Sequence, residues 1–318
     1  MKRLVIVDND GGVDDAWAIF LMLNDPEIEV IAFTCVFGNT TLDCVCTNNL
    51  RLSALFSDNK IPVYRGADSP LIPRLSGSPL PDDFQFFHGR NGFGDVSLPR
   101  LPDSVSVRPE AAFIKLNDLA KEYEGKITLV CLGPLTNVAL AMRAFPDFVD
   151  NLKEVFIMGG NYTALGNSTK RPEFNIHVDP EAADIVFRGL GDKCTLLPWE
   201  TCRSTKITLS WKESLEKCSG QAMKFLHAIE APLTSKKKAM GFDNFVSSDV
   251  LLAVVLTSGD AVVRDVRHHL GVELAGTYTR GQLVVLDHVD DRATSKVRIV
   301  QEVSAQKYMD AIEALKHL

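Results

Sequence analysis

The sequence predicts an α/β fold: an open, mainly parallel, Rossmann-like sheet with helices on both faces. Short apolar runs bounded by glycine or proline recur along the chain, and they are typical of strands buried on both faces. Longer stretches with apolar residues at helical spacing alternate with these runs, and such alternation produces parallel strands with helices on either side. No repeat or clear linker divides the 318 residues. We therefore expect a single domain over residues 1–318.

The amino-terminal half follows this alternation in order. The predicted elements are strand 4–7, helix 15–24, strand 29–34, helix 41–56, strand 61–64 and helix 109–122. Valine, isoleucine and phenylalanine dominate the strands, whereas helix 15–24 repeats apolar residues on one helical face. The stretch 65–107 is rich in proline, glycine and serine, and irregular stretches of this length are more often functional than idle. We expect its part 76–95 to act as a lid.

The same signals predict the elements of the carboxyl-terminal half. The expected order is strand 127–132, a helix through Arg143, strand 154–158, a polar loop to Asn175, a helix from Asp179, strand 194–197, helix 210–240, helix 247–256, a hairpin of 272–277 and 282–287, strand 295–302 and helix 305–318. Asp179, Pro180 and Glu181 combine an N-cap, a proline at the first helical position and an acid in the first turn. The three lysines at 236–238 are expected to form a solvated face.

Composition and charge exclude several classes of function. The net charge of −7 gives no basis for nucleic-acid binding, and no apolar stretch reaches the roughly 18 residues of a membrane span. Because the first strand follows only Lys2 and Arg3, we expect no signal peptide and a cytoplasmic protein. The seven cysteines are odd in number and scattered, so they are expected to be free thiols.

An acidic cluster follows the first strand. It consists of Asp8, Asp10, Asp14 and Asp15, with Gly11 and Gly12 among them. Ligand sites in open α/β sheets lie at the carboxyl ends of such strands. Four carboxylates packed there would repel one another, and a bound hard cation with oxygen ligands, Ca²⁺ or Mg²⁺, relieves that repulsion. The alternative is a solvated acidic turn in which Asp14 caps the next helix.

Further polar groups lie at or beyond the ends of later strands, and the topology should bring them to the same edge. They are Asn39, Leu132, Met158, Asn167, Glu173, Asn175 and Asp249. Carboxylates and a backbone carbonyl suit a hard cation, and asparagine and glutamate hydrogen-bond vicinal hydroxyls. Four aromatic residues are candidates to enclose a flat ring: Phe86, Phe87, Tyr162 and Phe174. Because no Gly-Lys-Ser/Thr loop is present, this set suits a polyol or nucleoside better than a phosphate.

The opening motif DNDGGVDDA resembles the signature DTDPGxDDA of the inosine–uridine preferring nucleoside hydrolases. The likeness continues, in family order, through VFGNTTLD, HGRNGFGD, LGPLTNVALA, IMGG, EFNIHVDPEAA and SSD. In that family a tightly held Ca²⁺ binds the ribose 2′ and 3′ hydroxyls and a water that attacks C1′. The resemblance implies hydrolysis of the N-glycosidic bond of ribonucleosides to free base and ribose, in a homodimer or homotetramer.

The resemblance also implies roles for particular residues. Asp10 would be both a Ca²⁺ ligand and the general base, and the other ligands would be Asp15, the backbone carbonyl of Leu132 and Asp249. Asp14 and Asn175 would hold the region of the 2′ and 3′ hydroxyls, and Asn39 would stabilise the sugar near C1′ as a catalytic residue. Asn167 and Glu173 would take the 5′ hydroxyl, Met158 would pack beneath the ribose, and His88 would lie near the base as a further catalytic residue.

The sequence departs from the family pattern at a few positions. Gly11 stands where proline is usual, and Leu132 stands where threonine is common, although only its carbonyl is needed. Ser248 stands where many members carry a histidine that serves as general acid for the leaving base. Serine cannot deliver a proton near neutral pH, so another group must do so or the preferred base must leave more easily. His88 is the nearest candidate by motif.

Two alternatives remain open at this point. The residues Asp8, Asn9, Asp10 and Gly11 match the DxDG start of haloacid-dehalogenase-type phosphatases, with Asp8 as nucleophile and Asp10 as acid. This short match leaves the other motifs without a role. The second alternative is a non-catalytic ribose- or nucleoside-binding protein that keeps the metal site, which the serine at 248 makes conceivable.

Overall fold

The structure is a computed structural model. It describes residues 2–73, 86–215, 220–241, 244–245, 247–286, 296–316 and 318. Parts of five predicted elements lie outside the described residues. They are the segment 76–85 of the expected lid, residues 216–219 of the expected helix 210–240, Asp287 of the hairpin, Ser295 of the last strand and His317 of the expected helix 305–318.

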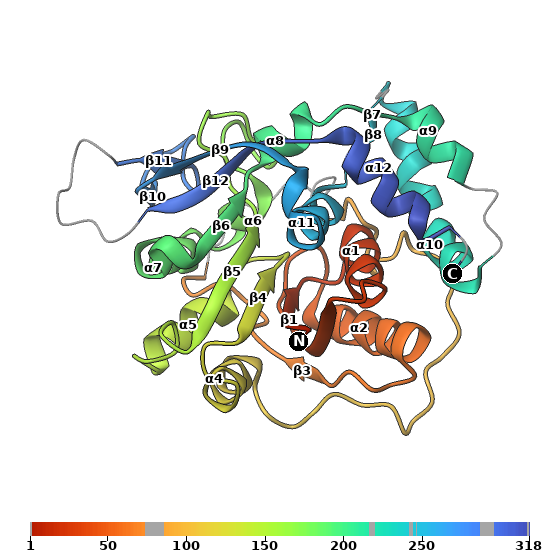
Figure 1. Ribbon diagram of the computed structural model, residues 1–318, viewed down its shortest axis with the longest axis horizontal. Coiled ribbons are helices and arrows are strands. Elements are labelled where there is room, and N and C mark those ends of the chain that lie inside the picture. Colours follow the sequence, from red (N-terminus) through yellow and green to blue (C-terminus); the bar gives the residue numbers. More distant parts are fainter. Residues whose placement is uncertain are drawn as a thin grey trace.

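An eight-stranded sheet forms the centre of the molecule (Figure 1). Its strands are β1 (Arg3–Asn9), β2 (Ile28–Cys35), β3 (Val63–Arg65), β4 (Ile127–Cys131), β5 (Leu152–Met158), β6 (Cys194–Leu197), β9 (Val262–His268) and β12 (Val297–Val303). The order is β3-β2-β1-β4-β5-β6-β12-β9, and every pair is parallel except β12 with β9. The predicted fold class is confirmed. The strand order reverses between β1 and β4, which is where open α/β sheets bind ligands.

Helices cover both faces of the sheet, and each face has its own hydrophobic core (Figure 1). One face carries α1 (Val13–Leu23), α2 (Leu42–Ser57), α10 (Gln221–Ala239), α11 (Ser248–Thr257) and α12 (Ala305–Ala314), and the other carries α4 (Ala112–Glu122), α5 (Thr136–Ala144) and α7 (Pro180–Leu190). The sheet contains both β1 and β12, from opposite ends of the chain, which supports the expectation of one domain over 1–318. No helix within the described ranges is both long and apolar enough to cross a membrane.

The remaining short elements correct several predictions. They are α6 (Phe174–Val178), α8 (Trp199–Ser204), α9 (Leu209–Ser214), two 3-10 turns (Gly191–Lys193 and Gly259–Ala261), and the strands β7 (Ile207–Thr208), β8 (Asn244–Phe245), β10 (Leu270–Val272) and β11 (Leu283–Val285). The predicted helix 210–240 consists of α9 and α10, and the latter begins after Gly220. The predicted hairpin exists, but its first strand lies at 270–272 and not at 272–277, because residues 273–282 form the turn. Strand β9 was not predicted, since its outward-facing charges interrupt the apolar pattern.

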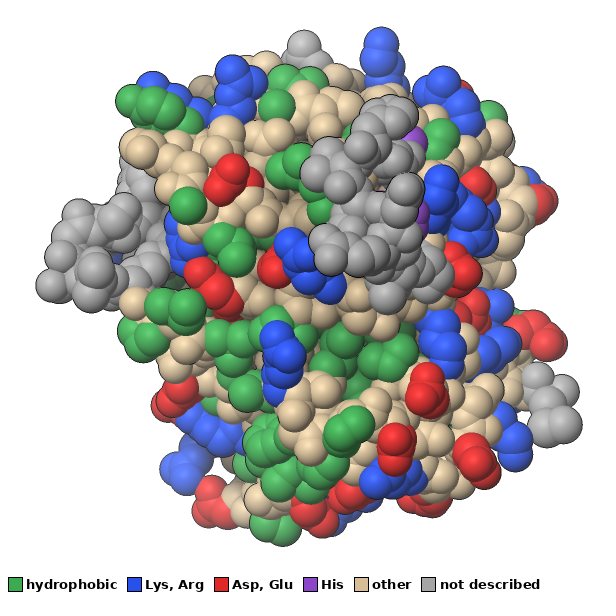
Figure 2. Space-filling view, turned by 90° about the vertical axis from the view of Figure 1, so that its left-hand side faces the viewer, with side chains coloured by type: hydrophobic (Ala, Val, Ile, Leu, Met, Phe, Trp, Pro, Cys, Tyr) green, Lys and Arg blue, Asp and Glu red, His purple; other side chains and the backbone are tan. Residues whose placement is uncertain are grey.

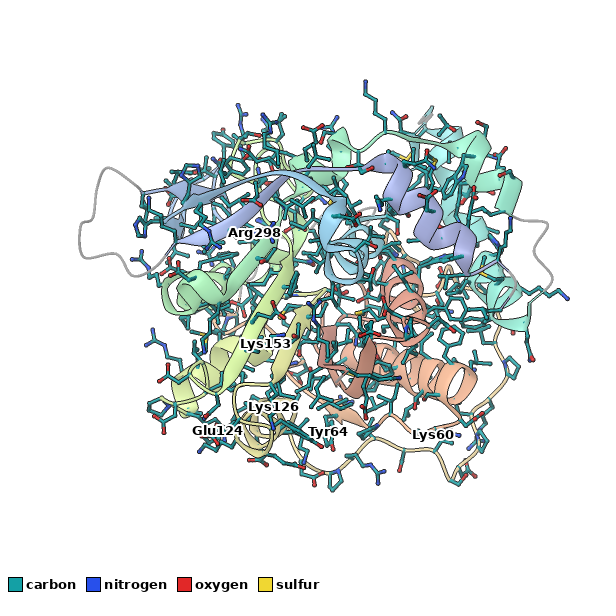
Figure 3. All side chains as sticks on the ribbon, in the orientation of Figure 1. Lys60, Tyr64, Glu124, Lys126, Lys153 and Arg298 are labelled. Atoms are coloured by element: carbon teal, nitrogen blue, oxygen red, sulfur yellow. The ribbon has the colours of Figure 1, made fainter. Side chains whose placement is uncertain are left out.

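Figure 3 labels Lys126 and Lys153, which lie at the amino-terminal ends of β4 and β5, opposite the edge where polar residues gather. On the face in Figure 2, acidic and basic side chains surround a group of hydrophobic ones. Apolar patches rimmed by charge occur at protein–protein contacts. The dimer or tetramer expected from the resemblance stays a prediction.

The prediction of free thiols is confirmed for the described cysteines, all six of which are free.

A buried network under the switch point joins β1, β2 and α5. Asp8 Oδ2 accepts hydrogen bonds from Thr34 Oγ1 at 2.6 Å and from Asn137 Nδ2 at 2.8 Å. Asn137 Nδ2 also donates to the carbonyl of Cys35 at 3.0 Å, and its Oδ1 accepts from the Ala67 amide at 2.8 Å. Burial raises the pKa of Asp8 to about 7. The side chain of Asn137 therefore joins α5 to β1, to β2 and to the loop after β3 through three hydrogen bonds.

We expect Asn137→Ala to lower the free energy of unfolding by about 2 kcal/mol, because it leaves a buried carboxylate, a carbonyl and an amide without their partner. Urea denaturation measures this loss. Lys60→Ala is the control, since Lys60 is exposed and pairs only with the exposed Asp58, and it should change stability by less than about 0.5 kcal/mol. Equal effects of the two substitutions would contradict this account of the network.

Candidate active site

The turn after β1 places the acidic cluster at the switch point. Asp10 follows the strand, and Gly11 adopts φ +68°, a left-handed conformation that glycine tolerates and proline cannot reach. A Cβ on Gly11 would lie 2.9 Å from the Cα of Val45, so the turn also packs directly on α2. Helix α1 then begins at Val13, directly after Gly12. The turn after β1 thus has a backbone conformation at position 11 that glycine can adopt and the usual proline cannot.

Asp10 is held from several sides. Its Oδ2 accepts from the backbone amide of Asn39 at 2.8 Å, and its Oδ1 accepts from Asn39 Nδ2 at 2.8 Å. A Cβ on Gly38 would lie 2.1 Å from Asp10 Oδ2, and a Cβ on Gly133 would lie 2.9 Å from Asp10 Cβ. Only glycine fits at these two positions, so the carboxylate of Asp10 has one fixed orientation.

Asp14, Asp15 and Asp249 converge beside Asp10. One carboxylate oxygen of each lies within 4.8 Å of those of the other two. Asp15 Oδ2 accepts from the Gly12 amide at 2.7 Å. Among the residues that the structure describes, Oδ1 of Asp14 and Oδ1 of Asp15 are buried and have no hydrogen-bond partner. The start of α1 and the start of α11 thus bring together carboxylates that local donors do not satisfy.

Burial and mutual repulsion both act on these carboxylates. Burial, followed by the charge of Asp15, raises the pKa of Asp10 well above its ordinary range. Burial and then the charge of Asp14 raise the pKa of Asp15 to about 7. Burial, followed by the charges of the neighbouring aspartates, raises the pKa of Asp249 well above its ordinary range. The carboxylate oxygens of this cluster suit a hard divalent cation. Such an ion would interact with the oxygens of Asp14 and Asp15 that have no hydrogen-bond donor.

The ends of β4 and β5 supply backbone groups to the same site. Asn175 Nδ2 donates to the carbonyl of Leu132 at 2.9 Å and to the carbonyl of Met158 at 3.1 Å. Asn175 is held in turn by Glu173, whose Oε1 accepts from the Asn175 amide at 2.9 Å. These contacts fix the amide side chain of Asn175 across the ends of two neighbouring strands.

Glu173 caps the short helix α6 and is fully engaged with the backbone. Its Oε2 accepts from the amides of Gly160 at 2.6 Å and Ile176 at 3.2 Å. Burial raises the pKa of Glu173 to about 7 despite these donors. Asn167 Oδ1 accepts from the Phe174 amide at 2.8 Å, which ties the loop to the start of α6. A polar capping residue thus explains why this loop contains a helix that hydrophobic periodicity did not indicate.

His88 closes the site from the long irregular segment. Its Nδ1 accepts from the Val13 amide at 3.2 Å, which assigns the proton of the neutral ring to Nε2. That Nε2 lies 3.6 Å from Asp14 Oδ1. Burial lowers the pKa of His88, so the ring is held neutral. Asn48 Nδ2 secures this segment by donating to the carbonyls of Gly11 at 2.9 Å and Asn91 at 2.8 Å.

These residues surround a cavity of about 830 Å³. Nine of the residues expected at the site line it: Asp14, Asn39, His88, Leu132, Met158, Asn167, Glu173, Asn175 and Asp249. Asp10 and Asp15 are fully buried and are not among the residues that line it. Of the four aromatic candidates, Phe87 and Phe174 line the cavity. Phe86 and Tyr162 do not line it. The guanidinium group of Arg90 lies over the ring of Phe86, and the hydroxyl of Tyr162 accepts a hydrogen bond from Gln301 Nε2.

The outer wall of the cavity contains residues that sequence reasoning missed. Trp199 and Arg203 come from α8, and Glu230, Lys236 and Lys237 come from α10. Trp199 lies two residues after the end of β6, and this position after a strand end could have indicated from the sequence that it belongs to the site. The prediction that the three lysines form a solvated face is wrong for Lys237, which is half-buried and turns toward the cavity.

The structure does not support the phosphatase alternative. The carboxylate of Asp8 would have to be the nucleophile, yet this residue is fully buried and hydrogen-bonded to Thr34 and Asn137. It does not line the cavity. The match of four residues therefore has no geometry that would serve phosphoryl transfer.

The stability of the protein should fall as pH rises when divalent cations are removed. Between the ordinary pKa of 3.8 and the folded value of about 7, folded Asp15 keeps a proton that the unfolded chain has released. The folded state then binds more protons, so the free energy of unfolding decreases with pH in this window. Thermal melts in a chelator and in Ca²⁺ at about pH 5 and about pH 8 test this, and Ca²⁺ should raise Tm more at the higher pH. With ionic strength matched, a Tm indifferent to Ca²⁺ at the higher pH would contradict a cation site.

The chain matches the family model described as inosine-uridine preferring nucleoside hydrolase over residues 5–310. It is 37% identical over 227 residues to uridine nucleosidase 1 of Arabidopsis thaliana, a match that spans 70% of this chain and 64% of that protein. It is 30% identical over 321 residues to the inosine-uridine preferring nucleoside hydrolase of Leishmania major, covering 99% of each. A solved structure of a plant nucleoside hydrolase superposes with a TM-score of 0.88, at 28% identity and 99% coverage of each chain. The chain therefore belongs to the inosine-uridine preferring nucleoside hydrolase family.

Proposed function

We propose that this protein hydrolyses the N-glycosidic bond of ribonucleosides to free base and ribose in a Ca²⁺-dependent reaction. The observation that supports this most is the buried carboxylate cluster at the floor of a cavity of about 830 Å³, a volume suited to a nucleoside. Full-length similarity to a nucleoside hydrolase of Leishmania major points to the same chemistry. No other arrangement of acids among the described residues combines this burial with an open cavity.

The proposed ligands of the Ca²⁺ are Asp10, Asp15, Asp249 and the carbonyl of Leu132. Carboxylate and carbonyl oxygens are the donors that Ca²⁺ takes, and the orphaned Oδ1 of Asp15 supports this set. When bound, the ion would orient a sugar diol and lower the pKa of a water. Asp14 belongs to the same acidic group and would face the 2′ and 3′ hydroxyls together with Asn175.

Asp10 is proposed to take the proton of the water that attacks C1′. Its two hydrogen bonds from Asn39 fix the orientation of the carboxylate, as a positioned general base requires. Positive charge develops on the ribose ring as the glycosidic bond breaks. Carboxylates and the amide oxygen of Asn39 around the ring would stabilise that charge electrostatically.

The other cavity residues would position the substrate. Asn167 uses its Oδ1 to accept from the Phe174 amide and lines the cavity with Glu173, so the two would hold the 5′ hydroxyl. Met158 would pack beneath the ribose. His88 would present its Nε2 proton to Asp14 or to the base, because its Nδ1 is already bonded to Val13.

A nucleoside-binding protein without turnover is the second candidate, because Ser248 lines the cavity where a proton donor would help. Incubation with inosine, uridine and cytidine followed by assay of free ribose separates the two. Release of ribose supports the hydrolase, whereas saturable binding without ribose supports the binding protein.

We expect Asp10→Ala and Asp15→Ala to abolish hydrolysis and to weaken Ca²⁺ binding. Each removes a carboxylate from the cluster, and Asp10→Ala also removes the base. Steady-state turnover and calorimetric Ca²⁺ titration measure the two effects. Asp103→Ala is the control because Asp103 is exposed and pairs only with the exposed Arg100. Turnover that survives in either cluster variant would remove the central assignment.

We expect Asn175→Ala to lower kcat by roughly 100-fold, because Asn175 contacts a region where charge develops on the sugar. The bonds from Asn175 to Leu132 and Met158 hold this side chain in the cavity wall. Kinetics with uridine and inosine give kcat and KM separately. A change confined to KM would show that Asn175 binds the ground state and transition state equally.

A further inference from the structure

Lys237 of α10 carries its positive charge into the cavity. Its Nζ lies 5.7 Å from the ring centroid of Phe87 and 5.4 Å from that of Phe245. Cations are attracted to the faces of aromatic rings at such distances, so the two rings hold the ammonium group in place. Phe87 is the neighbour of His88 in the chain, and all of Phe87, His88 and Lys237 line the cavity. The charge of Lys237 thus lies on the wall where His88 would meet the base.

The other candidates for donating a proton to the base are poorly suited. Ser248 lines the cavity, but a hydroxyl does not release a proton near neutral pH. His88 is neutral and its Nδ1 is occupied by the Val13 amide, so it can offer a hydrogen bond but not the proton of an imidazolium. Lys236 also lies over Phe87, at 5.6 Å, yet its side chain is exposed to solvent.

The charged groups around Lys237 are consistent with proton transfer. Burial lowers the pKa of Lys237, and Lys212 lowers it further, while Glu230 and Asp14 raise it. Glu230 forms an ion pair of 2.7 Å with Lys212, whose Nζ lies 3.8 Å from the ring centroid of Trp17. A lysine with a lowered pKa gives up its proton more readily at neutral pH than a solvated one.

We propose that Lys237 is the general acid that protonates the departing base, an inference that rests on the proposed hydrolase function. As the bond from C1′ to the base nitrogen breaks, its electron pair stays on the base, and a proton moves from Lys237 Nζ to the base. The attacking water forms the new bond to C1′ and gives a proton to Asp10. Asp10 releases that proton and Lys237 regains one from solvent before the next turnover.

The test compares natural nucleosides with p-nitrophenyl β-D-riboside in the wild type and in Lys237→Met. The nitrophenolate leaves without a proton, whereas hypoxanthine and uracil need one. We expect Lys237→Met to lower kcat for inosine and uridine by about 100-fold or more. Hydrolysis of the aryl riboside should stay within about threefold of wild type, because only the leaving-group step has changed.

Lys238→Met is the matched control. Lys238 is on the same helix, but it forms an ion pair with Glu213 and does not line the cavity. It should leave turnover of both substrate types unchanged.

In the wild type, nucleoside turnover should also fall as pH rises through the lowered pKa of Lys237, because the ammonium form is then lost. The aryl riboside should lack this alkaline decline.

The outcomes are distinct. An equal loss on nucleosides and aryl riboside would show that Lys237 serves binding or structure, and it would overturn the acid role. No loss on either substrate would overturn it as well. A wild type that cleaves the aryl riboside but no nucleoside would also contradict the inference while keeping the glycosidic chemistry. A wild type that cleaves neither would overturn the hydrolase function itself.

Discussion

The structure depends on holding several buried carboxylates together at the point where the strand order reverses. Two unit charges roughly 5 Å apart repel by about 3 kcal/mol at an effective dielectric constant of 20, more than a single hydrogen bond contributes. Asp14, Asp15 and Asp249 lie within that separation, and Asp10 is buried beside them. The glycines against Asp10, the donors from Asn39 and the packing of α1 on α11 all act against this repulsion. Packing and hydrogen bonds of the fold thus hold the carboxylates together against their mutual repulsion.

The parts of the fold that the sequence could predict are those in which local pattern and burial agree. Strands β1, β2, β4, β5 and β6 are apolar runs buried on both faces, and the helices between them show clear periodicity. Strand β9 is an edge strand whose partner, β12, comes later in the chain, so its charged outer residues concealed it. Helices α6 and α8 have five and six residues, and capping and tertiary contacts stabilise such helices more than periodicity does. Their existence therefore became visible only in three dimensions.

The same distinction applies to the site. The floor of the cavity consists of residues that follow strand ends, and the sheet rule brings these together without knowledge of the side-chain packing. The outer wall comes from α8 and α10, whose position over the sheet depends on contacts far apart in sequence. Three consecutive lysines give no local sign that the middle one turns inward, because that depends on Phe87 and Phe245. Of the candidate ring-enclosing aromatics, Phe86 and Tyr162 do not line the cavity, because Arg90 and Gln301 hold them elsewhere.

The hydrogen bond from the Val13 amide to His88 Nδ1 joins the first turn of α1 to a segment more than seventy residues away. A free energy that links two elements acts equally in both directions. A ligand that draws His88 outward must also leave a backbone donor of α1 unsatisfied, beside the carboxylates of Asp14 and Asp15. Conversely, whatever steadies the beginning of α1 also favours the inward position of His88. The position of His88 and the order of the first turn of α1 are therefore linked through one hydrogen bond of the imidazole ring.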